Sequence, residues 1–341
     1  MAGTGKHSIA EIAALCNVSK ATVSRVINNN PKGVGEETRQ RVLEAIEKLN
    51  YRPNALARSI ATARSGMIGL VVPDVSNFFY PAIIRGVTDC MDERGGSVLI
   101  ANSDYNPEME AAQLLRMIDR RVDGIILCSG VSNAKFLTEF RNYHVPIALM
   151  GRSFDIALCD VSISGDNVKG GYKSAEYLLR GGCRKIAFLE GSFSTSGGAQ
   201  RLEGYRRAHE EKGIPVDSSL LMEGEYSIEF GKKAARQLAK RRNAFDAVIT
   251  GSDLIAIGLT TEFPSCGIRV PEDIEVIGYD DIELASVFHP ALSTISKPHY
   301  DMARVITKQL MKVVEGEKVR LPHMKVEPEL VLRETTKARK A

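Results

Sequence analysis

Apolar residues in the first fifty positions recur at the spacing of short helices. The run SIAE at residues 8–11 has the S-x-x-E form of a capping box, so we expect a helix to begin at Ser8. Asn17-Val18 predicts a tight turn, and Ser19 is expected to cap a second helix. A third helix should follow Gly35 and be stopped by Pro53. The side chains expected to face inward from these helices are Ile12, Ala13, Leu15, Cys16, Val23, Val26, Ile27, Val42, Ile46 and Leu49.

Beyond Gly66 the pattern changes to short apolar runs separated by helical stretches. The runs cover residues 67–73, 97–103, 123–129, 146–151, 185–191, 246–252 and 274–280. Helical periodicity occurs between them at 81–94, 107–121 and 199–213. This alternation is typical of an α/β fold with parallel, doubly wound sheets covered by helices on both faces. Two such sheets fit the length, and a ligand then binds beyond the carboxyl ends of the strands.

The charge of the chain is unevenly distributed. The 341 residues are 44% hydrophobic and carry a net charge of +3. Residues 1–64 hold ten Lys and Arg against five acids, whereas the remainder holds 35 against 37. A basic excess confined to the first fifth of the chain indicates contact with a polyanion, although an ordinary basic solvated face also accounts for it.

Several functional classes receive no support from the sequence. Six cysteines are scattered without a CxxC pair, which argues against a zinc site and a disulfide framework. No run of 18 apolar residues occurs and the first residues lack an apolar signal region, so we expect a cytoplasmic protein with no membrane partner. The GTGKHS run lacks the first glycine of a phosphate-binding loop, and no HExxH, GxSxG or kinase pattern occurs. We therefore expect neither an enzyme nor a metal or cofactor.

The second predicted helix has an outer face with hydroxyls and cations but no carboxylate. The residues on this face are Lys20, Ala21, Ser24, Arg25 and Asn28. Two short helices of this kind, joined by a turn, predict a helix-turn-helix whose second helix enters the major groove of DNA without repelling phosphates. Arg25 has the reach to bind guanine O6 and N7 as a fork.

Residues 51–66, YRPNALARSIATARSG, follow the third helix. Asn54 could cap a further short helix from Ala55 to about Ala61. A helix of this length is marginal in water, so we expect it to order only on a partner. A plain linker fits the composition equally well.

Taken together, these stretches resemble the lac repressor/galactose repressor (LacI/GalR) family of bacterial transcriptional regulators. SIAEIAALCNVSKATVSRVIN and YRPNALARSI are similar to the family's DNA-binding headpiece and hinge helix. RLEGY, RVPEDIEVIGYDD and VLRETT extend the resemblance over nearly the whole chain. The resemblance implies a helix-turn-helix headpiece at 1–52, a hinge helix and linker at 53–66, and a two-lobed core at 67–341 of the periplasmic-binding-protein type. Its N-lobe is expected at about 67–164 and 294–320, and its C-lobe at about 165–293 and 321–336.

The resemblance also implies roles in DNA binding. It places Lys20, Ala21 and Arg25 at base-reading positions, with Ile9 near the edge of the groove. The residues at phosphate-contacting positions are Ser8, Ser19, Thr22, Ser24, Asn28 and Thr38. In the hinge, Ile60, together with Ala57, occupies the position of the minor-groove wedge. The family usually has Leu where this chain has Ile60, and a Ser where Gly35 precedes the third helix.

Candidate ligand-binding residues follow the predicted strands of the core. They are Phe79, Tyr80, Asp166, Arg201, Tyr226, Ser252, Asp253 and Asp280. Carboxylates and a guanidinium in one cleft suit a polyhydroxylated ligand, and the aromatic rings suit the apolar face of a sugar or a planar base. Each acid taken alone could equally be a helix cap or half of an ion pair. The resemblance strengthens the assignment for Arg201, Asp280 and the Ser252-Asp253 pair, although relatives commonly have Asn at position 252.

We therefore expect a transcriptional repressor that binds a pseudo-palindromic operator as a homodimer. A small effector, most simply a sugar or sugar derivative, should bind between the lobes. Helices 81–94 and 107–121 are candidate dimer surfaces. A purine or nucleoside, a phosphorylated metabolite or a protein co-effector are alternatives, and a solute-binding receptor without DNA function is a more distant one.

Overall fold

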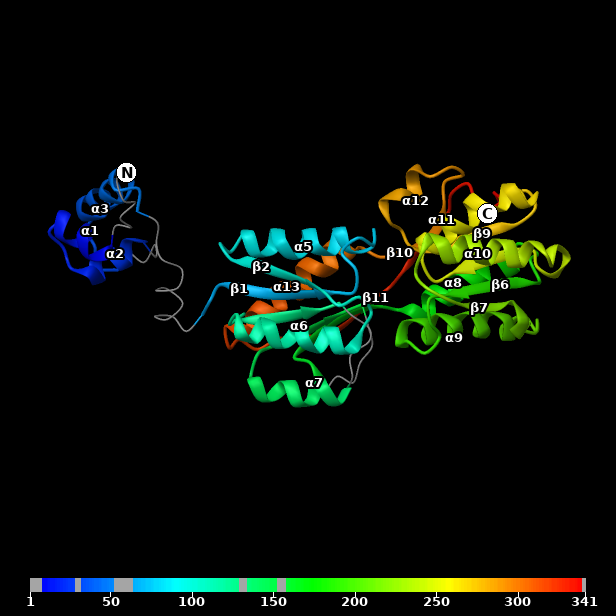
Figure 1. Ribbon diagram of the computed structural model, residues 1–341, viewed down its shortest axis with the longest axis horizontal. Coiled ribbons are helices and arrows are strands. Elements are labelled where there is room, and N and C mark those ends of the chain that lie inside the picture. The colour runs from blue at the N-terminus through cyan, green and yellow to red at the C-terminus, as the bar shows by residue number, and fades with distance from the viewer. Residues whose placement is uncertain (1–7, 28–31, 52–63, 129–133, 152–157, 339–341) are drawn as a thin grey trace. The chain divides into compact units, whose positions relative to one another are not determined.

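The computed structural model describes residues 8–27, 32–51, 64–128, 134–151 and 158–338 (Figure 1). The chain divides into two compact units, residues 1–65 and 66–341. The first unit corresponds to the expected headpiece and the second to the expected core. None of the described helices is both long enough and apolar enough to cross a membrane.

The N-terminal unit consists of three helices, α1 (Ile9–Leu15), α2 (Lys20–Ile27) and α3 (Glu36–Lys48). The expected capping box is present: the Ser8 side chain accepts a hydrogen bond from the Glu11 amide, and the Glu11 carboxylate accepts one from the Ser8 amide. Ser19 accepts a hydrogen bond from the Thr22 amide at 3.0 Å, which satisfies a free donor at the start of α2. The buried core contains Ile12, Ala13, Cys16, Val23, Val26, Val42 and Ala45.

Two expectations for this unit are wrong. Leu15 was assigned to the apolar face of α1, yet it is 56% exposed because the helix turns only its Ile12, Ala13 and Cys16 side inward. The third helix ends at Lys48, before Pro53 is reached. Asn50 has φ of 46°, and a residue in this left-handed conformation cannot continue a right-handed helix.

The first sheet of the C-terminal unit is parallel throughout, with strand order β11-β5-β4-β3-β1-β2. Helices α5 (Tyr80–Asp92) and α13 (His299–Val314) cover one face, and α6 (Pro107–Asp119) and α7 (Ala134–Phe140) cover the other (Figure 1). A short 3₁₀ turn, η1 (Arg141–Tyr143), follows α7. The strands are β1 (Met67–Val72), β2 (Ser97–Asn102), β3 (Gly124–Leu127), β4 (Ile147–Met150), β5 (Val161–Gly165) and β11 (His323–Val326).

The second sheet has strand order β12-β10-β9-β8-β6-β7, and only the β10–β12 pair is antiparallel. Helices α8 (Asn167–Arg180) and α9 (Ser196–Glu211) cover one face, and α10 (Ile228–Ala239) and α11 (Asp253–Glu262) cover the other. The strands are β6 (Ile186–Glu190), β7 (Leu221–Glu223), β8 (Ala247–Thr250), β9 (Glu275–Asp280), β10 (Ser293–Ser296) and β12 (Glu329–Val331). The short helices are η3 (Ser218–Leu220), η4 (Arg242–Ala244), η5 (Phe263–Cys266) and α12 (Glu283–Val287).

The doubly wound α/β prediction is confirmed, but the expected lobe boundaries are shifted. The lobe built on the first sheet is the N-lobe, and the lobe built on the second is the C-lobe. The chain crosses between them after β5, after β10 and after β11. β10 pairs with β9, so residues 294–296 belong to the C-lobe and not the N-lobe. β11 pairs with β5, so residues 323–326 belong to the N-lobe and not the C-lobe.

Candidate functional site

The second helix of the N-terminal unit, α2, has an exposed face that carries part of the expected DNA-reading surface. Lys20, Ala21 and Arg25 are exposed, and α2 contains no acidic residue. Val23 and Val26 are buried on its opposite side, against α1 and α3. The buried valines therefore fix which side of α2 faces outward. The Arg25 guanidinium lies close to Gly33, whose φ of 80° turns the chain back after the helix.

The residues expected to contact phosphates lie at the N-terminal caps of α1 and α2 and within α2 and α3. Ser8 and Ser19 are exposed, whereas Thr22, Ser24 and Thr38 are half-buried. Ile9, expected near the edge of the groove, is also half-buried. The Ser19 and Thr22 hydroxyls lie 2.9 Å apart and hydrogen-bond to each other. The Ser19 hydroxyl thus caps α2, and the Thr22 hydroxyl bonds to this cap. Asn28, Ala57 and Ile60 lie outside the described residues, as does the expected hinge helix.

In the C-terminal unit, most of the candidate effector residues line one cavity of about 120 Å³. Seven of the eight expected residues contribute to its wall: Phe79, Tyr80, Arg201, Tyr226, Ser252, Asp253 and Asp280. They come from both lobes, since Phe79 and Tyr80 begin α5 whereas the other five belong to the C-lobe. The cavity is therefore the interlobe site expected at the carboxyl ends of the strands.

Asp166, the eighth candidate, does not line this cavity. Its side chain accepts a hydrogen bond from the Lys169 amide at 3.1 Å and thereby caps α8. Its Oδ1 also lies 3.5 Å from Nζ of Lys325, a residue of β11. The structure therefore gives Asp166 the role of helix cap and ion-pair partner, the alternative that the sequence left open for each acid.

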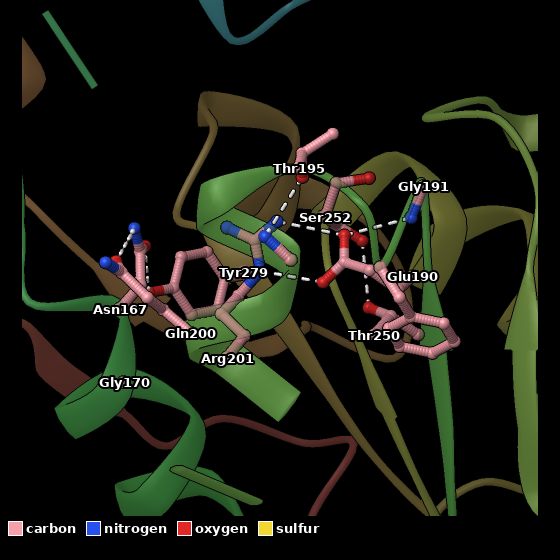
Figure 2. Close-up of polar contacts among 12 residues, drawn as sticks. Asn167, Gly170, Glu190, Gly191, Thr195, Gln200, Arg201, Thr250, Ser252 and Tyr279 are labelled. Carbon is pink, nitrogen blue, oxygen red and sulfur yellow. Dashed lines mark hydrogen bonds and ion pairs between the residues drawn. The ribbon is translucent and has the colours of Figure 1, made fainter. Parts of the chain in front are cut away.

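Arg201 is held by a buried carboxylate that the sequence analysis did not identify. Nε and Nη2 of Arg201 donate to the two oxygens of Glu190 at 2.8 and 2.9 Å, and Nη2 also donates to the Tyr226 hydroxyl at 3.0 Å (Figure 2). Glu190 is completely buried at the end of β6. Burial opposes the charge of Arg201, but the nearby Glu190 carboxylate raises the pKa of the guanidinium well above its ordinary value. This bidentate geometry orients Arg201 before any ligand binds.

Asp253 lies deeper and interacts mainly with its own lobe. Its carboxylate accepts hydrogen bonds from the Thr294 hydroxyl at 2.5 Å and from the Ile282 amide at 2.9 Å. Burial raises the pKa of Asp253 well above its usual value. Ser252 caps α11 by accepting a hydrogen bond from the Ile255 amide. The pair therefore fixes the α11 terminus at the wall of the cavity.

Asp280 is the acid that stands at the boundary of the two lobes. Its φ of 107° is rare for a residue with a side chain, and backbone strain of this kind concentrates at ligand sites. Nζ of Lys297 lies 3.2 Å from Oδ1 of Asp280, and Nε2 of His299 lies 3.9 Å from the same oxygen. Lys297 and His299 follow β10, at the second crossing, and both line the cavity.

Aromatic rings form the N-lobe side of the cavity. The Phe79 ring packs edge-on against Tyr80, with centroids 4.9 Å apart, and against His299, with centroids 4.7 Å apart. Burial raises the pKa of Tyr80 well above its usual value. An apolar wall facing a charged wall suits a ligand with one apolar and one polar face.

Four further residues line the cavity or hold its side chains in place, and the sequence analysis did not identify them. They are Glu190, Tyr279, Lys297 and His299. Arg201 and Lys297 lie over the Tyr279 ring, at 4.7 and 4.4 Å from its centroid. The Tyr279 hydroxyl donates to Asn167 at 2.9 Å (Figure 2). Glu190 and Tyr279 lie at the carboxyl ends of predicted strands, where ligand-binding residues are expected, so the sequence could have identified them. Lys297 and His299 follow β10, a strand that was not predicted. No cluster of potential metal ligands occurs among the described residues.

Comparison with known proteins agrees with both parts of this description. The model of bacterial regulatory proteins of the lacI family matches residues 8–54, and that of periplasmic binding protein-like domains matches residues 175–336. Catabolite control protein A of Priestia megaterium is 34% identical over 322 residues, which cover 93% of this chain and 96% of that protein.

Two solved structures extend the similarity to the fold. The lac repressor dimer bound to operator and the anti-inducer ONPF superposes with a TM-score of 0.86 at 26% identity, covering 97% of this chain and 99% of that one. A complex of the transcriptional regulator CelR with cellobiose has a TM-score of 0.73 at 30% identity, covering 96% and 99%. Its headpiece, its two-lobed core and these relatives show that the chain belongs to the lacI family of bacterial regulatory proteins.

Proposed function

We propose that this protein is a transcriptional repressor that binds a pseudo-palindromic operator as a homodimer and responds to a small effector in the interlobe cavity. The observation that carries the proposal is the outer face of α2, a helix without an acidic residue, on which Lys20, Ala21 and Arg25 are exposed. A helix with this face enters the major groove without repelling phosphates. Such a regulator acts in the cytoplasm, where bacterial DNA lies.

Operator binding is tested with DNA selected from a random library by the full chain. In fluorescence anisotropy, Arg25→Ala is expected to cost about 1–3 kcal/mol of discrimination at the base it reads. Weak, salt-dependent binding to any DNA should persist, since phosphate contacts supply it. Lys48→Ala is the matched control, because Lys48 is an exposed cation at the end of α3 and off the reading face. Equal discrimination by the Arg25 variant and the unchanged protein would refute the placement of α2 in the groove.

Homodimerisation is supported by apolar side chains left exposed beside the first sheet. Ile100 on β2 and Met109 and Leu115 on α6 are each 39% exposed. The expected dimer surface at 107–121 includes two of them. Analytical ultracentrifugation of Leu115→Glu and of the unchanged protein tests this surface. An equal dimer dissociation constant in the two proteins would exclude α6 from the dimer interface.

The hinge remains part of the proposal. We expect residues 55–61 to become helical on operator, with Ile60 and Ala57 at the minor groove, and to lose that order when the effector changes the angle between the lobes. A typical coupling of this kind amounts to about 1–3 kcal/mol. Identical hydrogen exchange at residues 55–60 with and without operator would remove this mechanism.

The effector is proposed to be a sugar or a sugar derivative. Arg201, Asp280 and Ser252 supply convergent donors and acceptors, and Phe79 supplies an apolar wall. A thermal-shift screen against pentoses, hexoses, their phosphates, nucleosides and purines tests this assignment. A ligand at about 100 times its dissociation constant adds roughly 2.7 kcal/mol to the stability of the folded state. If only a purine raises the melting temperature, the effector is a purine and not a sugar.

A further inference from the structure

Lys297 is a cation enclosed within the wall of the effector cavity. Its side chain is only 8% exposed, its Nζ lies 3.2 Å from Asp280, and the ammonium is 4.4 Å from the centre of the Tyr279 ring. The aliphatic stem packs on Gly165 at the end of β5, so closely that an added Cβ there would overlap Cδ of Lys297. The ammonium is therefore held at the cavity by packing along its stem as well as by its counter-charge.

Two nitrogen donors at the cavity have no hydrogen-bond partner among the described residues. An ammonium has three N–H groups and no acceptor, and a guanidinium has five N–H groups and no acceptor. Nε and Nη2 of Arg201 donate to Glu190 and Tyr226, whereas Nη1 makes no hydrogen bond within the described part of the chain. Nε2 of His299 is buried at the same cavity and likewise lacks a hydrogen-bond partner among the described residues. A ligand that contributes acceptors would satisfy these groups.

The charged groups at the cavity differ in how far each one is already neutralised. Arg201 and Lys297 are the cationic side chains of the wall, and Asp253 and Asp280 are the acids. Burial raises the pKa of Asp253 and so weakens its contribution as an anion. Burial, reinforced by the charge of Lys297, lowers the pKa of His299 to about 4, so its ring is neutral near pH 7. Glu190 already neutralises Arg201 from behind the wall. The remaining charged pair is Lys297 with Asp280, and burial lowers the pKa of Lys297. His299 adds an uncharged donor beside this pair.

We propose that the effector carries an oxyanion, a carboxylate or a phosphate, on its polyhydroxylated body, and that Lys297 and His299 bind this group. This inference rests on the proposed function, since it assumes that the cavity holds the effector. A hydroxyl of a neutral sugar can also accept from these donors, but it carries no charge and is the weaker acceptor for an ammonium. An oxyanion accepts hydrogen bonds from Lys297 and from His299 in its Nε2–H tautomer, while Asp280 keeps one bond to Lys297.

Matched pairs of ligands test this selectivity on the full chain. Isothermal titration compares glucose with glucuronate and glucose 6-phosphate, and ribose with ribose 5-phosphate. The expected result is that at least one anionic member binds ten times more tightly than its neutral counterpart. Binding of the acids alone, or of the phosphates alone, distinguishes the two sources of the oxyanion.

Variants then assign the selectivity to Lys297. Lys297→Gln should weaken binding of the anionic ligand at least tenfold and bring it close to that of the neutral sugar. Lys297→Arg keeps the charge and should retain the preference. Lys325→Gln is the matched control, because it also removes a lysine charge beside an aspartate, yet Lys325 is half-exposed and lies outside the cavity wall.

Three outcomes would overturn the inference. They are a preference for the neutral sugars, a Lys297→Gln variant with unchanged preference, and an absence of binding by every anionic ligand. Operator binding is measured on the same preparations. Intact operator binding together with any of these outcomes would leave the repressor function standing and remove only the oxyanion. Loss of operator selectivity in the unchanged protein would instead contradict the proposed function itself.

Discussion

Removing the Arg201 guanidinium should destabilise the protein even when no ligand is present. Glu190 is completely buried and accepts two charged hydrogen bonds from Arg201. After Arg201→Met, the Glu190 carboxylate would keep a hydrogen bond from the Gly191 amide at 2.9 Å but no counter-charge at this distance. Leaving one partner of a buried ion pair uncompensated typically costs about 3–5 kcal/mol. We expect a loss of that size in the free energy of unfolding.

The pairing itself is measured by a double-mutant cycle. Replacing both partners, as Arg201→Met with Glu190→Leu, removes the orphaned charge, so the double variant should be more stable than Arg201→Met alone. Urea unfolding followed by circular dichroism, without ligand and near pH 7, gives the four free energies. Arg236→Met serves as control, since its pair with Glu262 is half-exposed and surface pairs contribute about 0–1 kcal/mol.

The reasoning is refuted if Arg201→Met costs no more than the Arg236 control, or if the two replacements at the buried pair are additive. The result also affects how ligand data are interpreted. A ligand response lost in an Arg201 variant would combine a missing contact with a disturbed site. Binding should therefore be compared only between variants whose free energies of unfolding are known.

Three further outcomes follow from the described contacts. Burial lowers the pKa of the His299 imidazole from 6.5 to about 4 in the folded protein. Below about pH 6.5 the unfolded chain therefore takes up a proton that the folded protein does not, so the free energy of unfolding falls as the pH drops toward 4. Between pH 7.5 and 5 the loss should be about 2 kcal/mol in urea titrations and should disappear in His299→Gln. Ser8→Ala removes half of the capping box and should lower headpiece stability by about 1 kcal/mol in thermal unfolding of residues 1–65, whereas Ser8→Asp should not. Gly171→Ala should lower the melting temperature of the core sharply, because an added Cβ would overlap the Arg201 carbonyl oxygen where α8 meets α9. An unchanged melting temperature would contradict this close approach of the two helices.

The sequence predicted the repeating parts of the fold better than the connections between them. Runs such as 67–73 and 274–280 are long and apolar, so their burial in a central strand follows from composition. β10 (Ser293–Ser296) and β11 (His323–Val326) have four residues each, with serines, a histidine or a lysine among them. Their pairing depends on neighbours distant in the chain, which local patterning does not encode. The shifted lobe boundaries are a direct result.

The same distinction applies to the cavity. Arg201, Asp253 and Asp280 follow recognisable strands and motifs, and they were placed correctly at its wall. Lys297 lies next to Asp280 only because the chain passes between the lobes after β10. Asp166 follows a strand, as Asp253 does, but as the N-cap residue of α8 it directs its carboxylate to the backbone. Which of two roles an acid takes depends on side-chain direction, and spacing does not determine that.

The order of the three crossings has a consequence for synthesis on the ribosome. Strands β1 to β5 emerge early, but α13, which supplies Met302, Ile306 and Leu310 to one face of their sheet, comes only after residue 298. At typical rates of 5–20 residues per second, the roughly 130 intervening residues take about 7–27 seconds to be made. During that interval the part of this sheet face that α13 covers stays exposed beside α5, while the headpiece can already fold. Nascent chains that stop short of residue 299 are therefore expected to be substrates for chaperones.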